Sequence, residues 1–326
     1  MKEVIFEETG KPSEVLKVRE APAPEPKPHE VQIQVKARNI NPSDLMFIRG
    51  RYGIKPDLPS SAGFEAAGVV SISDAEGKYP VGTRVMFTAQ GTNMGTWREY
   101  ITLPAKQVIP MPDAMSFEVA CQAFVNPVTA VAMVNKANLN AGEWVLLTAG
   151  ASAFGKFAIQ VAKAKGINVA CTVRHDEQKE YLTLLGADLV INTEKEDLKK
   201  VISGKIEAGV SAVFDAVGGE LGAQAFSCLK SKGKMYVFGV LSLQKMPLDT
   251  GAMIFKETTI EGFWLSSILQ QISNEDRASL YKETQEFLMR DDSKADVAAK
   301  FPLTEVKAAI EAYNKPGRNG KILLVS

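Results

Sequence analysis

The segment 144–166 joins an apolar run, a glycine-containing turn and an amphipathic helix pattern. Residues 144–148 (WVLLT) form the uninterrupted apolar run that is typical of a strand buried on both faces of a parallel sheet. The turn Thr148-Ala-Gly-Ala-Ser-Ala-Phe-Gly155 follows, and apolar residues then recur at helical spacing until Gly166. This order of strand, turn and helix predicts a βαβ unit and places the chain in the α/β class.

The same alternation continues along the chain. Strand-like runs lie at 168–173, 189–191, 212–214, 234–238 and 259–263, and amphipathic stretches lie at 177–185 and 221–229. Strands that alternate with helices in this way are typical of a doubly wound parallel sheet, the Rossmann arrangement.

The first 120 or so residues show a different pattern of apolar residues. Residues 31–37 alternate with period two, 66–72 form a short apolar run, and 83–88 lead into a glycine-rich loop at 90–95. Four prolines in 21–28 (APAPEPKP) exclude a helix or an inner strand there. We expect a compact β barrel or sandwich, with the proline-rich segment extended on its surface.

The chain length supports more than one domain, because 326 residues are about twice the length of an average domain. We expect a β domain over 1–123 and the parallel-sheet domain over 124–265. The segment 266–326, with a helix at 274–289 and a strand at 320–325, is expected to return to the first domain.

Composition excludes several classes of protein. Lys+Arg and Asp+Glu both number 38, and this neutral balance argues against a nucleic-acid partner. No run of 18 uncharged apolar residues predicts a membrane span. Three cysteines, 50 and 57 residues apart, and only two histidines form no disulfide framework or metal pattern. We therefore expect no metal, a reducing compartment and a cytoplasmic location.

The turn after the first parallel strand predicts a dinucleotide site. Gly150 and Gly155 let the backbone N–H groups of Ala151, Ser152, Ala153 and Phe154 face a pyrophosphate at a helix N-terminus. Ser152 and Ala153 stand where a full Gly-x-Gly-x-x-Gly motif has its second glycine, so a purely structural turn is the alternative.

The end of the next strand predicts which dinucleotide is bound. An NAD site normally offers a carboxylate there to the ribose hydroxyls, but this strand ends Cys171-Thr-Val-Arg174-His175. A guanidinium pairs well with a 2′-phosphate, so Arg174 favours NADPH. His175 is expected beside the adenine or the phosphate, and an exposed loop histidine is the alternative.

Five separate stretches carry a resemblance to a known family. They are Asn39-Ile-Asn-Pro-Ser-Asp44, Gly50-Arg-Tyr52-Gly with Leu58-Pro59 following, Gly95-Thr-Trp-Arg98, Asn126-Pro-Val-Thr-Ala130 and Gly262-Phe-Trp-Leu-Ser266. In these stretches the chain resembles the mitochondrial-type 2-enoyl thioester (trans-2-enoyl-CoA/acyl-carrier-protein) reductases. These are a branch of the medium-chain dehydrogenase/reductase superfamily, and quinone oxidoreductases of that superfamily are the next most similar group. The resemblance implies a GroES-like catalytic domain over 1–123.

The chain departs from the zinc-containing members of that superfamily. Gly63-Phe64-Glu65 has phenylalanine where those members have a zinc-binding histidine, and Asn41-Pro-Ser-Asp44 has no cysteine. Without a Lewis acid to lower an alcohol's pKa, alcohol oxidation loses its electrophile. The branches that reduce activated C=C bonds or quinones are therefore favoured.

The resemblance assigns roles to single residues. Tyr52 falls on the catalytic tyrosine, whose phenol, with a pKa of about 10, is protonated at neutral pH and can donate a proton. Asn41 falls near the nicotinamide, Thr129 near the nicotinamide or its ribose, and Trp264 on the wall of the acyl pocket with Tyr52. For each of the four, a turn, capping or packing role is the alternative. The expected cofactor-binding residues also include Val217, Gly218, Phe238, Gly239, Val240, Phe263, Trp264 and Leu265.

These features predict an NADPH-dependent reductase of α,β-unsaturated thioesters, with Tyr52 as the proton donor. A quinone or enone reductase with the same fold and cofactor is one alternative, and a non-catalytic NADPH-binding protein is another. The resemblance further implies a homodimer and an acyl carrier protein as a partner.

Overall fold

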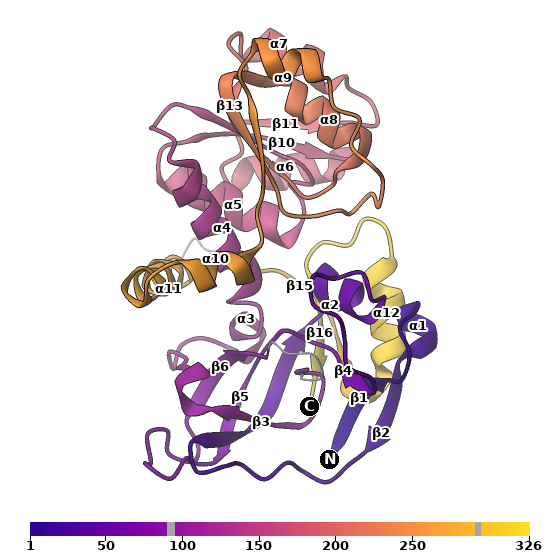
Figure 1. Ribbon diagram of the computed structural model, residues 1–326, viewed down its shortest axis with the longest axis vertical. Coiled ribbons are helices and arrows are strands. Elements are labelled where there is room, and N and C mark those ends of the chain that lie inside the picture. Colours follow the sequence, from indigo (N-terminus) through magenta and orange to yellow (C-terminus); the bar gives the residue numbers. More distant parts are fainter. Residues whose placement is uncertain (90–94, 291–294) are drawn as a thin grey trace. The chain divides into compact units, whose positions relative to one another are not determined.

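The computed structural model describes residues 1–89, 95–290 and 295–326, and the chain divides into two compact units (Figure 1). The first unit contains Met1–Val125 and Ala295–Ser326, and the second contains Asn126–Lys294. Of the glycine-rich loop expected at 90–95, residues 90–94 lie outside the described residues.

The first unit consists of two sheets with short helices. Its larger sheet has the strand order β15-β16-β3-β5-β6-β8, with β7 also paired to β3, and its smaller sheet has the order β2-β1-β4. The strands are β1 (Lys2–Phe6), β2 (Lys17–Glu20), β3 (Glu30–Asn39), β4 (Ser60–Ser61), β5 (Glu65–Ile72), β6 (Arg84–Thr88), β7 (Tyr100–Pro104), β8 (Val108–Pro110), β15 (Val297–Pro302) and β16 (Lys321–Val325). The helices are α1 (Pro12–Val15), α2 (Pro42–Ile48), η1 (Ala105–Gln107), α3 (Phe117–Ala120), η3 (Leu303–Glu305) and α12 (Val306–Asn314).

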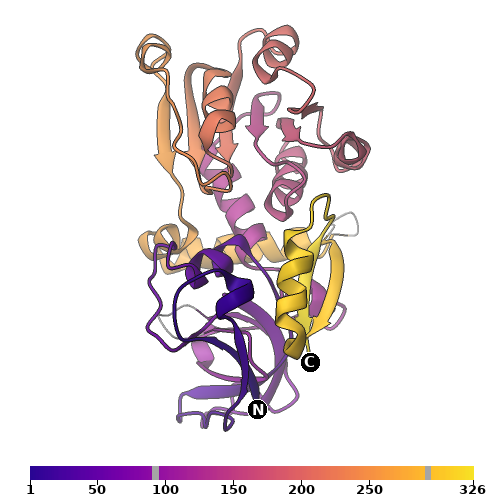
Figure 2. The same cartoon turned by 90° about the vertical axis from the view of Figure 1, so that its right-hand side faces the viewer.

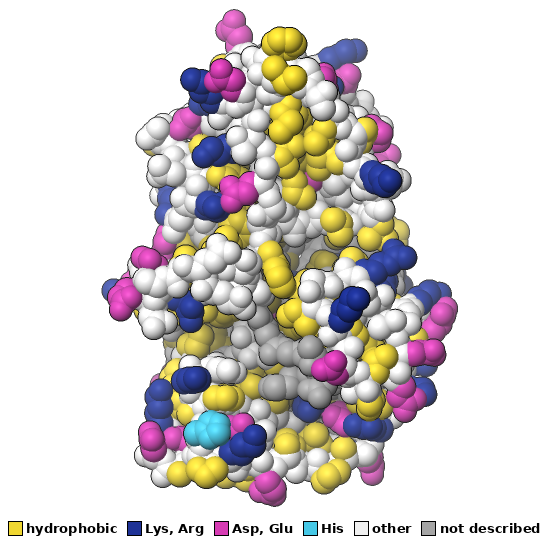
Figure 3. All heavy atoms as spheres, in the orientation of Figure 1, with side chains coloured by type: hydrophobic (Ala, Val, Ile, Leu, Met, Phe, Trp, Pro, Cys, Tyr) yellow, Lys and Arg dark blue, Asp and Glu magenta, His cyan; other side chains and the backbone are white. Residues whose placement is uncertain are grey.

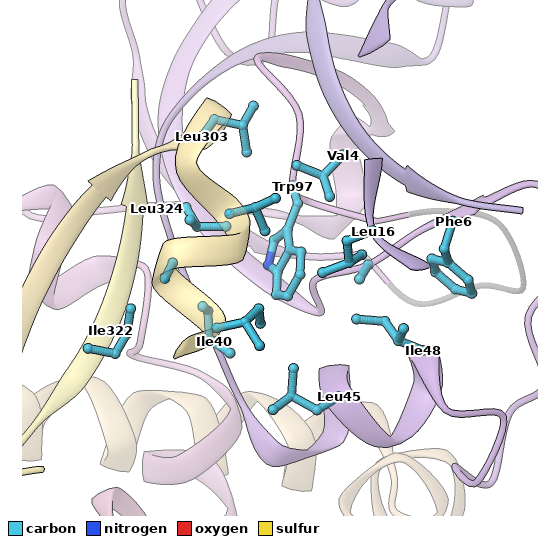
Figure 4. Close-up of a cluster of buried hydrophobic side chains, with 14 of the residues drawn as sticks. Val4, Phe6, Leu16, Ile40, Leu45, Ile48, Trp97, Leu303, Ile322 and Leu324 are labelled. Carbon is cyan, nitrogen blue, oxygen red and sulfur yellow. The ribbon is translucent and has the colours of Figure 1, made fainter. Parts of the chain in front are cut away.

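The core of this unit joins residues from both ends of the chain. Figure 4 shows Trp97 surrounded by side chains such as Val4, Leu16, Ile40 and Leu324, all of them fully buried. Helix α12 lies against β15 and β16 (Figure 2). Because β16 pairs with β3, the C-terminal strand belongs to the larger sheet of the first unit, as expected for 320–325.

The second unit is built on a wholly parallel sheet with the strand order β11-β10-β9-β12-β13-β14. This order confirms the doubly wound Rossmann arrangement. The strands are β9 (Trp144–Leu147), β10 (Asn168–Val173), β11 (Leu189–Asn192), β12 (Val210–Asp215), β13 (Leu229–Val237) and β14 (Thr259–Gly262). The helices are α4 (Val125–Ala137), α5 (Ala153–Ala164), η2 (Asp176–Gln178), α6 (Lys179–Leu184), α7 (Leu198–Lys205), α8 (Gly219–Ser227), α9 (Thr250–Phe255), α10 (Leu265–Gln271) and α11 (Asn274–Leu288).

The segment 266–326 does not return to the first unit as a whole. Residues 266–290 belong to the second unit, and only 295–326 belong to the first. The reason is packing: Phe287 of α11 is buried and makes an edge contact with Phe157 of α5, with ring centroids 6.2 Å apart. Glu283 of α11 also forms an ion pair with Lys165, with 2.8 Å between the oxygen and nitrogen. The polar pattern of this helix concealed its buried face.

Candidate functional site

The turn between β9 and α5 leaves backbone donors for a ligand. Ser152 caps α5, and its hydroxyl accepts a hydrogen bond from the Gly155 N–H at 3.0 Å. In the described part of the chain, the N–H groups of Ala151, Ala153 and Phe154 donate to no acceptor. Three such groups at a helix N-terminus form a site for an anion such as a pyrophosphate.

Both glycines of this turn are required by close packing. A Cβ at Gly155 would lie 2.4 Å from the carbonyl oxygen of Gly150, and a Cβ at Gly150 would lie 2.7 Å from the Cβ of Cys171. Ala149, with φ of 52°, has the left-handed conformation that the sequence offered no sign of. The tight turn is therefore built from small residues without the second glycine of the full motif.

Asp215 connects this turn to the end of the neighbouring strand β12. Its carboxylate is fully buried and accepts a hydrogen bond from the Thr148 hydroxyl at 2.7 Å. It also accepts from the Val217 and Gly218 N–H groups at 3.0 and 2.9 Å. Val217 and Gly218, both expected to bind the cofactor, are thus held at the carboxyl edge of the sheet by a residue to which sequence reasoning gave no role of its own.

The end of β10 places Arg174 on the surface and His175 half-buried. The carboxylate that follows, Asp176, is occupied by other partners. It accepts from Lys195 Nζ at 2.5 Å and from Asn192 Nδ2 at 2.8 Å, and these bonds lower the pKa of Asp176 to about 2. The cations around Asp176 keep its charge from opposing an anion beside Arg174.

Further expected residues lie at the ends of β13 and β14. The Phe238 ring contacts the Phe154 ring with centroids 4.1 Å apart, and a Cβ at Gly239 would lie 2.5 Å from the Ala216 carbonyl oxygen. Val240 is exposed. The sheet therefore brings the residues expected at 151–155, 217–218 and 238–240 to the carboxyl ends of adjacent strands, the edge where such folds bind ligands.

Trp264 is 40% exposed, which is not the burial that a core tryptophan would have. It caps α10, which begins at Leu265, whereas its neighbour Phe263 is buried and bonds to β13 through its N–H. Thr129 is buried in the first turns of α4. All three belong to the second unit, and Tyr52 and Asn41 belong to the first.

In the first unit, the Tyr52 side chain is half-buried and packs against the core around Trp97. Its ring lies 5.1 Å from the ring of Phe64, centroid to centroid. From the resemblance described above, Phe64 is expected to stand at the position of the zinc-binding histidine of zinc-containing enzymes. The side chain at this position is aromatic and packs against the expected proton donor, Tyr52.

Two of the quoted motifs meet beside Phe64. Gly63 has φ of 99°, and a Cβ there would lie 2.3 Å from the Thr96 hydroxyl oxygen. The Thr96 hydroxyl donates to the Glu65 carbonyl at 3.1 Å, and Trp97 Nε1 donates to the Asn39 carbonyl at 3.2 Å. The stretch 95–98 is therefore packed on the stretch 63–65.

The N–H of Phe64 donates to a cluster of buried polar residues, Asn39, Asn41, Asp44, Glu65 and Lys321, which we call the polar knot. Glu65 accepts hydrogen bonds from Asn39 Nδ2 at 2.7 Å and from Asn41 Nδ2 at 2.8 Å. Its second oxygen accepts from the Phe124 and Val125 N–H groups at 3.1 and 2.9 Å. This glutamate was noted in the sequence only for its missing histidine neighbour, yet it organises the knot.

Asn41 is 1% exposed, and its amide is engaged inside the knot. Besides the bond to Glu65, Asn41 Nδ2 donates to Asn39 Oδ1 at 3.0 Å, and Asn41 Oδ1 accepts from Lys321 Nζ. A contact of this amide with a nicotinamide would have to compete with these bonds or add to them.

Asp44 and Lys321 carry the perturbed charges of the knot. Burial raises the pKa of the Asp44 carboxyl to about 7, although it accepts from the Asn41 and Phe64 N–H groups at 2.7 and 3.0 Å. Burial lowers the pKa of the Lys321 ammonium to about 8, against the attraction of Glu65 and Asp44. Asn41-x-x-Asp44 is a capping-box spacing that sequence could have revealed, whereas nothing local identified Lys321.

Over the described ranges, no group of three or more His, Cys, Asp or Glu side chains could hold a metal ion. No helix in those ranges has the length and apolarity to cross a membrane.

Comparison with known proteins adds the following matches. Residues 27–113 match the family described as alcohol dehydrogenase GroES-like domain, and residues 153–281 match the family described as zinc-binding dehydrogenase. The mitochondrial enoyl-[acyl-carrier-protein] reductase of Caenorhabditis elegans is 33% identical over 84% of this chain and 80% of that protein. The enzyme of the same name from Arabidopsis thaliana is 30% identical over 82% and 73%. The solved Escherichia coli quinone oxidoreductase complexed with NADPH is 27% identical, with a TM-score of 0.91 over the whole of both chains.

Proposed function

The chain belongs to the medium-chain dehydrogenase/reductase family, and from that premise we propose that it is an NADPH-dependent reductase of the C=C bond of 2-enoyl thioesters. The observation that carries this proposal is the contact between Tyr52 and Phe64, with ring centroids 5.1 Å apart. In this contact the Tyr52 phenol packs against the residue that stands at the position expected for a zinc-binding histidine. The relatives named as enoyl-[acyl-carrier-protein] reductases support the same substrate class.

The cofactor proposal rests on the fit of the residues at the sheet edge. The donors of Ala151, Ala153 and Phe154 would hold the pyrophosphate, and the close-packed glycines give its oxygens access to the backbone. Arg174 would pair with the 2′-phosphate, which makes NADPH the cofactor in preference to NADH. When bound, the cofactor supplies a hydride.

Most of the residues expected around the nicotinamide end lie at the carboxyl ends of strands in the same sheet as the turn. Val217, Gly218, Phe238, Gly239 and Val240 share the sheet edge with the turn, and Phe263, Trp264 and Leu265 follow the adjacent strand. We assign Thr129 to the nicotinamide or its ribose, Trp264 to the acyl pocket, and His175 to the adenosine end. Asn41 is assigned to the nicotinamide side through the knot that holds its amide.

Tyr52 has one chemical task in this proposal. The alkene carbon β to the thioester gains the hydride, and the α-carbon gains a proton from the Tyr52 hydroxyl, so that the C=C double bond becomes a C–C single bond with two new C–H bonds. The phenolate that remains recovers its proton from water. Hydrogen bonding to the developing enolate and alignment of the alkene supply the rest of the rate enhancement.

A quinone or enone reductase is the second candidate. The similarity to the Escherichia coli quinone oxidoreductase favours it, because that match covers the whole of both chains. Hydride transfer to a quinone gives an aromatic hydroquinone monoanion that water can protonate, so Tyr52 would matter little in that reaction. Binding of NADPH without turnover of either substrate class would instead indicate the third possibility, a non-catalytic NADPH-binding protein.

Partners and location follow as further proposals. An acyl carrier protein is a candidate donor of the thioester. A homodimer is supported by the edge position of β14 and by exposed hydrophobic side chains of the second unit, which include Val240, Leu241, Leu243, Ile254 and Phe255. Hydrophobic side chains also gather in the upper part of the face shown in Figure 3. The three cysteines are free, which fits a reducing compartment such as the cytoplasm.

The test is a comparison of acceptors with the wild-type protein. Initial rates of NADPH and NADH oxidation are measured with trans-2-hexenoyl-CoA and with a 1,4-naphthoquinone. The proposal predicts the highest kcat/KM for NADPH with the enoyl thioester. Activity with the quinone alone would select the second candidate.

A further inference from the structure

Lys321 is a buried lysine at the start of the C-terminal strand β16, with 4% of its surface exposed. The backbone conformation of the preceding residue sets the direction in which Lys321 begins the strand. Gly320 has φ of 114°, and a Cβ there would lie 2.8 Å from the Ala298 nitrogen. The Lys321 N–H donates to the Asp296 carbonyl at 2.8 Å. A long, charged side chain is thus directed into the core of the first unit rather than to water.

Carboxyl and amide side chains surround the Lys321 ammonium. Lys321 Nζ donates to Asn41 Oδ1, and the carboxylates of Glu65 and Asp44 both attract it. Glu65 and Asp44 are 1% and 0% exposed. Two buried carboxyl groups without a cation would be strongly destabilising, and the buried Lys321 ammonium supplies the compensating charge.

The knot is connected to Tyr52 along two routes. Asp44 accepts from the N–H of Phe64, whose ring contacts Tyr52, so it fixes the wall behind the tyrosine. Asp44 also accepts from the N–H of Asn41, the residue that caps α2. Helix α2 ends at Ile48. The N–H of Arg51, the residue before Tyr52, donates to the Met46 carbonyl at 2.9 Å and so connects this residue to the last turn of the helix.

We propose that Lys321 is a positioning residue for Tyr52: its ammonium, delivered by the C-terminal strand, holds the knot of Asn41, Asp44 and Glu65 and thereby fixes both the helix and the wall that orient the phenol. This inference rests on the proposed function of Tyr52 as proton donor. Lys321 itself touches neither substrate nor cofactor in this account. A shift of the phenol by a fraction of an ångström is enough to lower the rate of proton donation.

The first test is a double-mutant cycle on kcat with trans-2-hexenoyl-CoA. Lys321→Met is compared with wild type, Tyr52→Phe and the double variant, and Lys321→Gln serves as a second substitution if the methionine variant does not fold. We expect Lys321→Met to lower kcat about 10-fold or more with little change in KM, but to change kcat less than about 3-fold when Tyr52 is already phenylalanine. Additive losses in the two backgrounds would overturn the inference.

The second test monitors the environment of the Tyr52 ring by ¹⁹F NMR and does not depend on enzyme activity. The protein is labelled with 3-fluorotyrosine, and the ¹⁹F resonances of Tyr52 and Tyr79 are assigned with Tyr→Phe variants. We expect Lys321→Met or Lys321→Gln to shift or broaden the Tyr52 resonance and to leave Tyr79, which bonds to the Val108 carbonyl, in place. An unchanged Tyr52 resonance would overturn the inference.

The two tests separate this inference from the function on which it rests. If Tyr52→Phe leaves the wild-type rate intact, the proposed proton donor is wrong, and the fluorine resonances still decide whether Lys321 positions the ring. Lys300→Met is the matched control, because Lys300 lies on the neighbouring strand β15 and forms an ion pair with Glu118 at 3.0 Å on the surface. It should change neither readout.

Discussion

The rings of Tyr52 and Phe64 lie 5.1 Å apart, centroid to centroid, with an interplanar angle of 34°. Phe64 also makes an edge contact with Phe47 of α2, with ring centroids 5.6 Å apart. Because Phe64 is 4% exposed and its N–H is bonded to Asp44, it is a fixed surface for the more accessible tyrosine. The Tyr52 phenol therefore packs against a buried aromatic side chain, and a hydrogen bond to a buried carboxyl group holds that residue in place.

Replacing that wall tests its role. Phe64→Leu keeps a large apolar side chain and should destabilise the protein by no more than about 2 kcal/mol. It should nevertheless lower kcat with the enoyl thioester, by about 3-fold to 10-fold, because Tyr52 loses its aromatic neighbour. Steady-state kinetics and denaturant unfolding measure the two effects. Phe87→Leu, in a different core of the same unit, is the control, and an equal kcat loss there would refute a specific role.

Gly155 is predicted to tolerate no side chain. In Gly155→Ala the new Cβ would meet the backbone of Gly150 at 2.4 Å, so the turn must open and the free N–H groups beside it must move. We expect a rise of 10-fold or more in the Kd for NADPH, measured by fluorescence titration. Gly204→Ala, where a Cβ meets nothing within 4 Å, should leave the Kd unchanged. Unchanged binding in Gly155→Ala would contradict the assignment of this turn to the pyrophosphate.

Arg174 is predicted to set the cofactor preference. Loss of a charge-assisted bond of about 1.5–3 kcal/mol corresponds to roughly 10-fold to 150-fold in affinity. Arg174→Ala should raise the KM for NADPH by that factor and change the KM for NADH little. The exposed Lys232, on β13 of the same unit, provides Lys232→Ala as the control. A parallel rise for both cofactors would show that Arg174 does not recognise the 2′-phosphate.

Asp44 should give stability an unusual pH dependence. Its pKa is about 7 in the folded protein, above the ordinary value of 3.8, so between these values the folded state binds more protons than the unfolded state. The free energy of unfolding therefore falls as pH rises through this window, by up to about 1.4 kcal/mol per pH unit. This contribution is fully present below the ordinary pKa and lost above pH 7.

Denaturant unfolding of wild type and Asp44→Asn between pH 4 and 8 isolates that contribution. The difference between the two proteins should change in favour of the variant as pH rises from 4 to 7 and then level off. The exposed Asp57→Asn provides the control and should run parallel to wild type. Parallel profiles for Asp44→Asn as well would mean that this carboxyl does not have the raised pKa.

The fold was largely predictable from local patterns, but a strand without a run of apolar residues was not predicted. The apolar run at 144–148 became β9, and the run at 168–173 became β10, because buried parallel strands carry continuous apolar residues. The strand β15 (Val297–Pro302) has mostly exposed side chains and lies at the sheet edge, so it left no apolar signal. The helix expected at 221–229 ends at Ser227, and β13 begins at Leu229, earlier than the expected 234.

The site was predictable only where a motif is local. The turn 150–155 and Arg174 could be read from the chain, because a strand, a turn and a helix follow one another in sequence. Lys321 lies 280 residues from Asn41, and no spacing rule connects them. Glu65 and Asp44 needed the fold to show that they share one buried cluster, because an acidic residue in sequence is normally a solvated one.

The central claim is that Tyr52 donates the proton. The most direct measurement is NADPH oxidation with trans-2-hexenoyl-CoA by wild type and by folded Tyr52→Phe, with Tyr79→Phe as the control and cofactor affinities matched. If Tyr52 is the proton donor, Tyr52→Phe alone loses two or more orders of magnitude in kcat, the range expected for a general acid. A Tyr52→Phe variant that reduces the thioester at the wild-type rate, or a wild type that reduces only quinones, would contradict it.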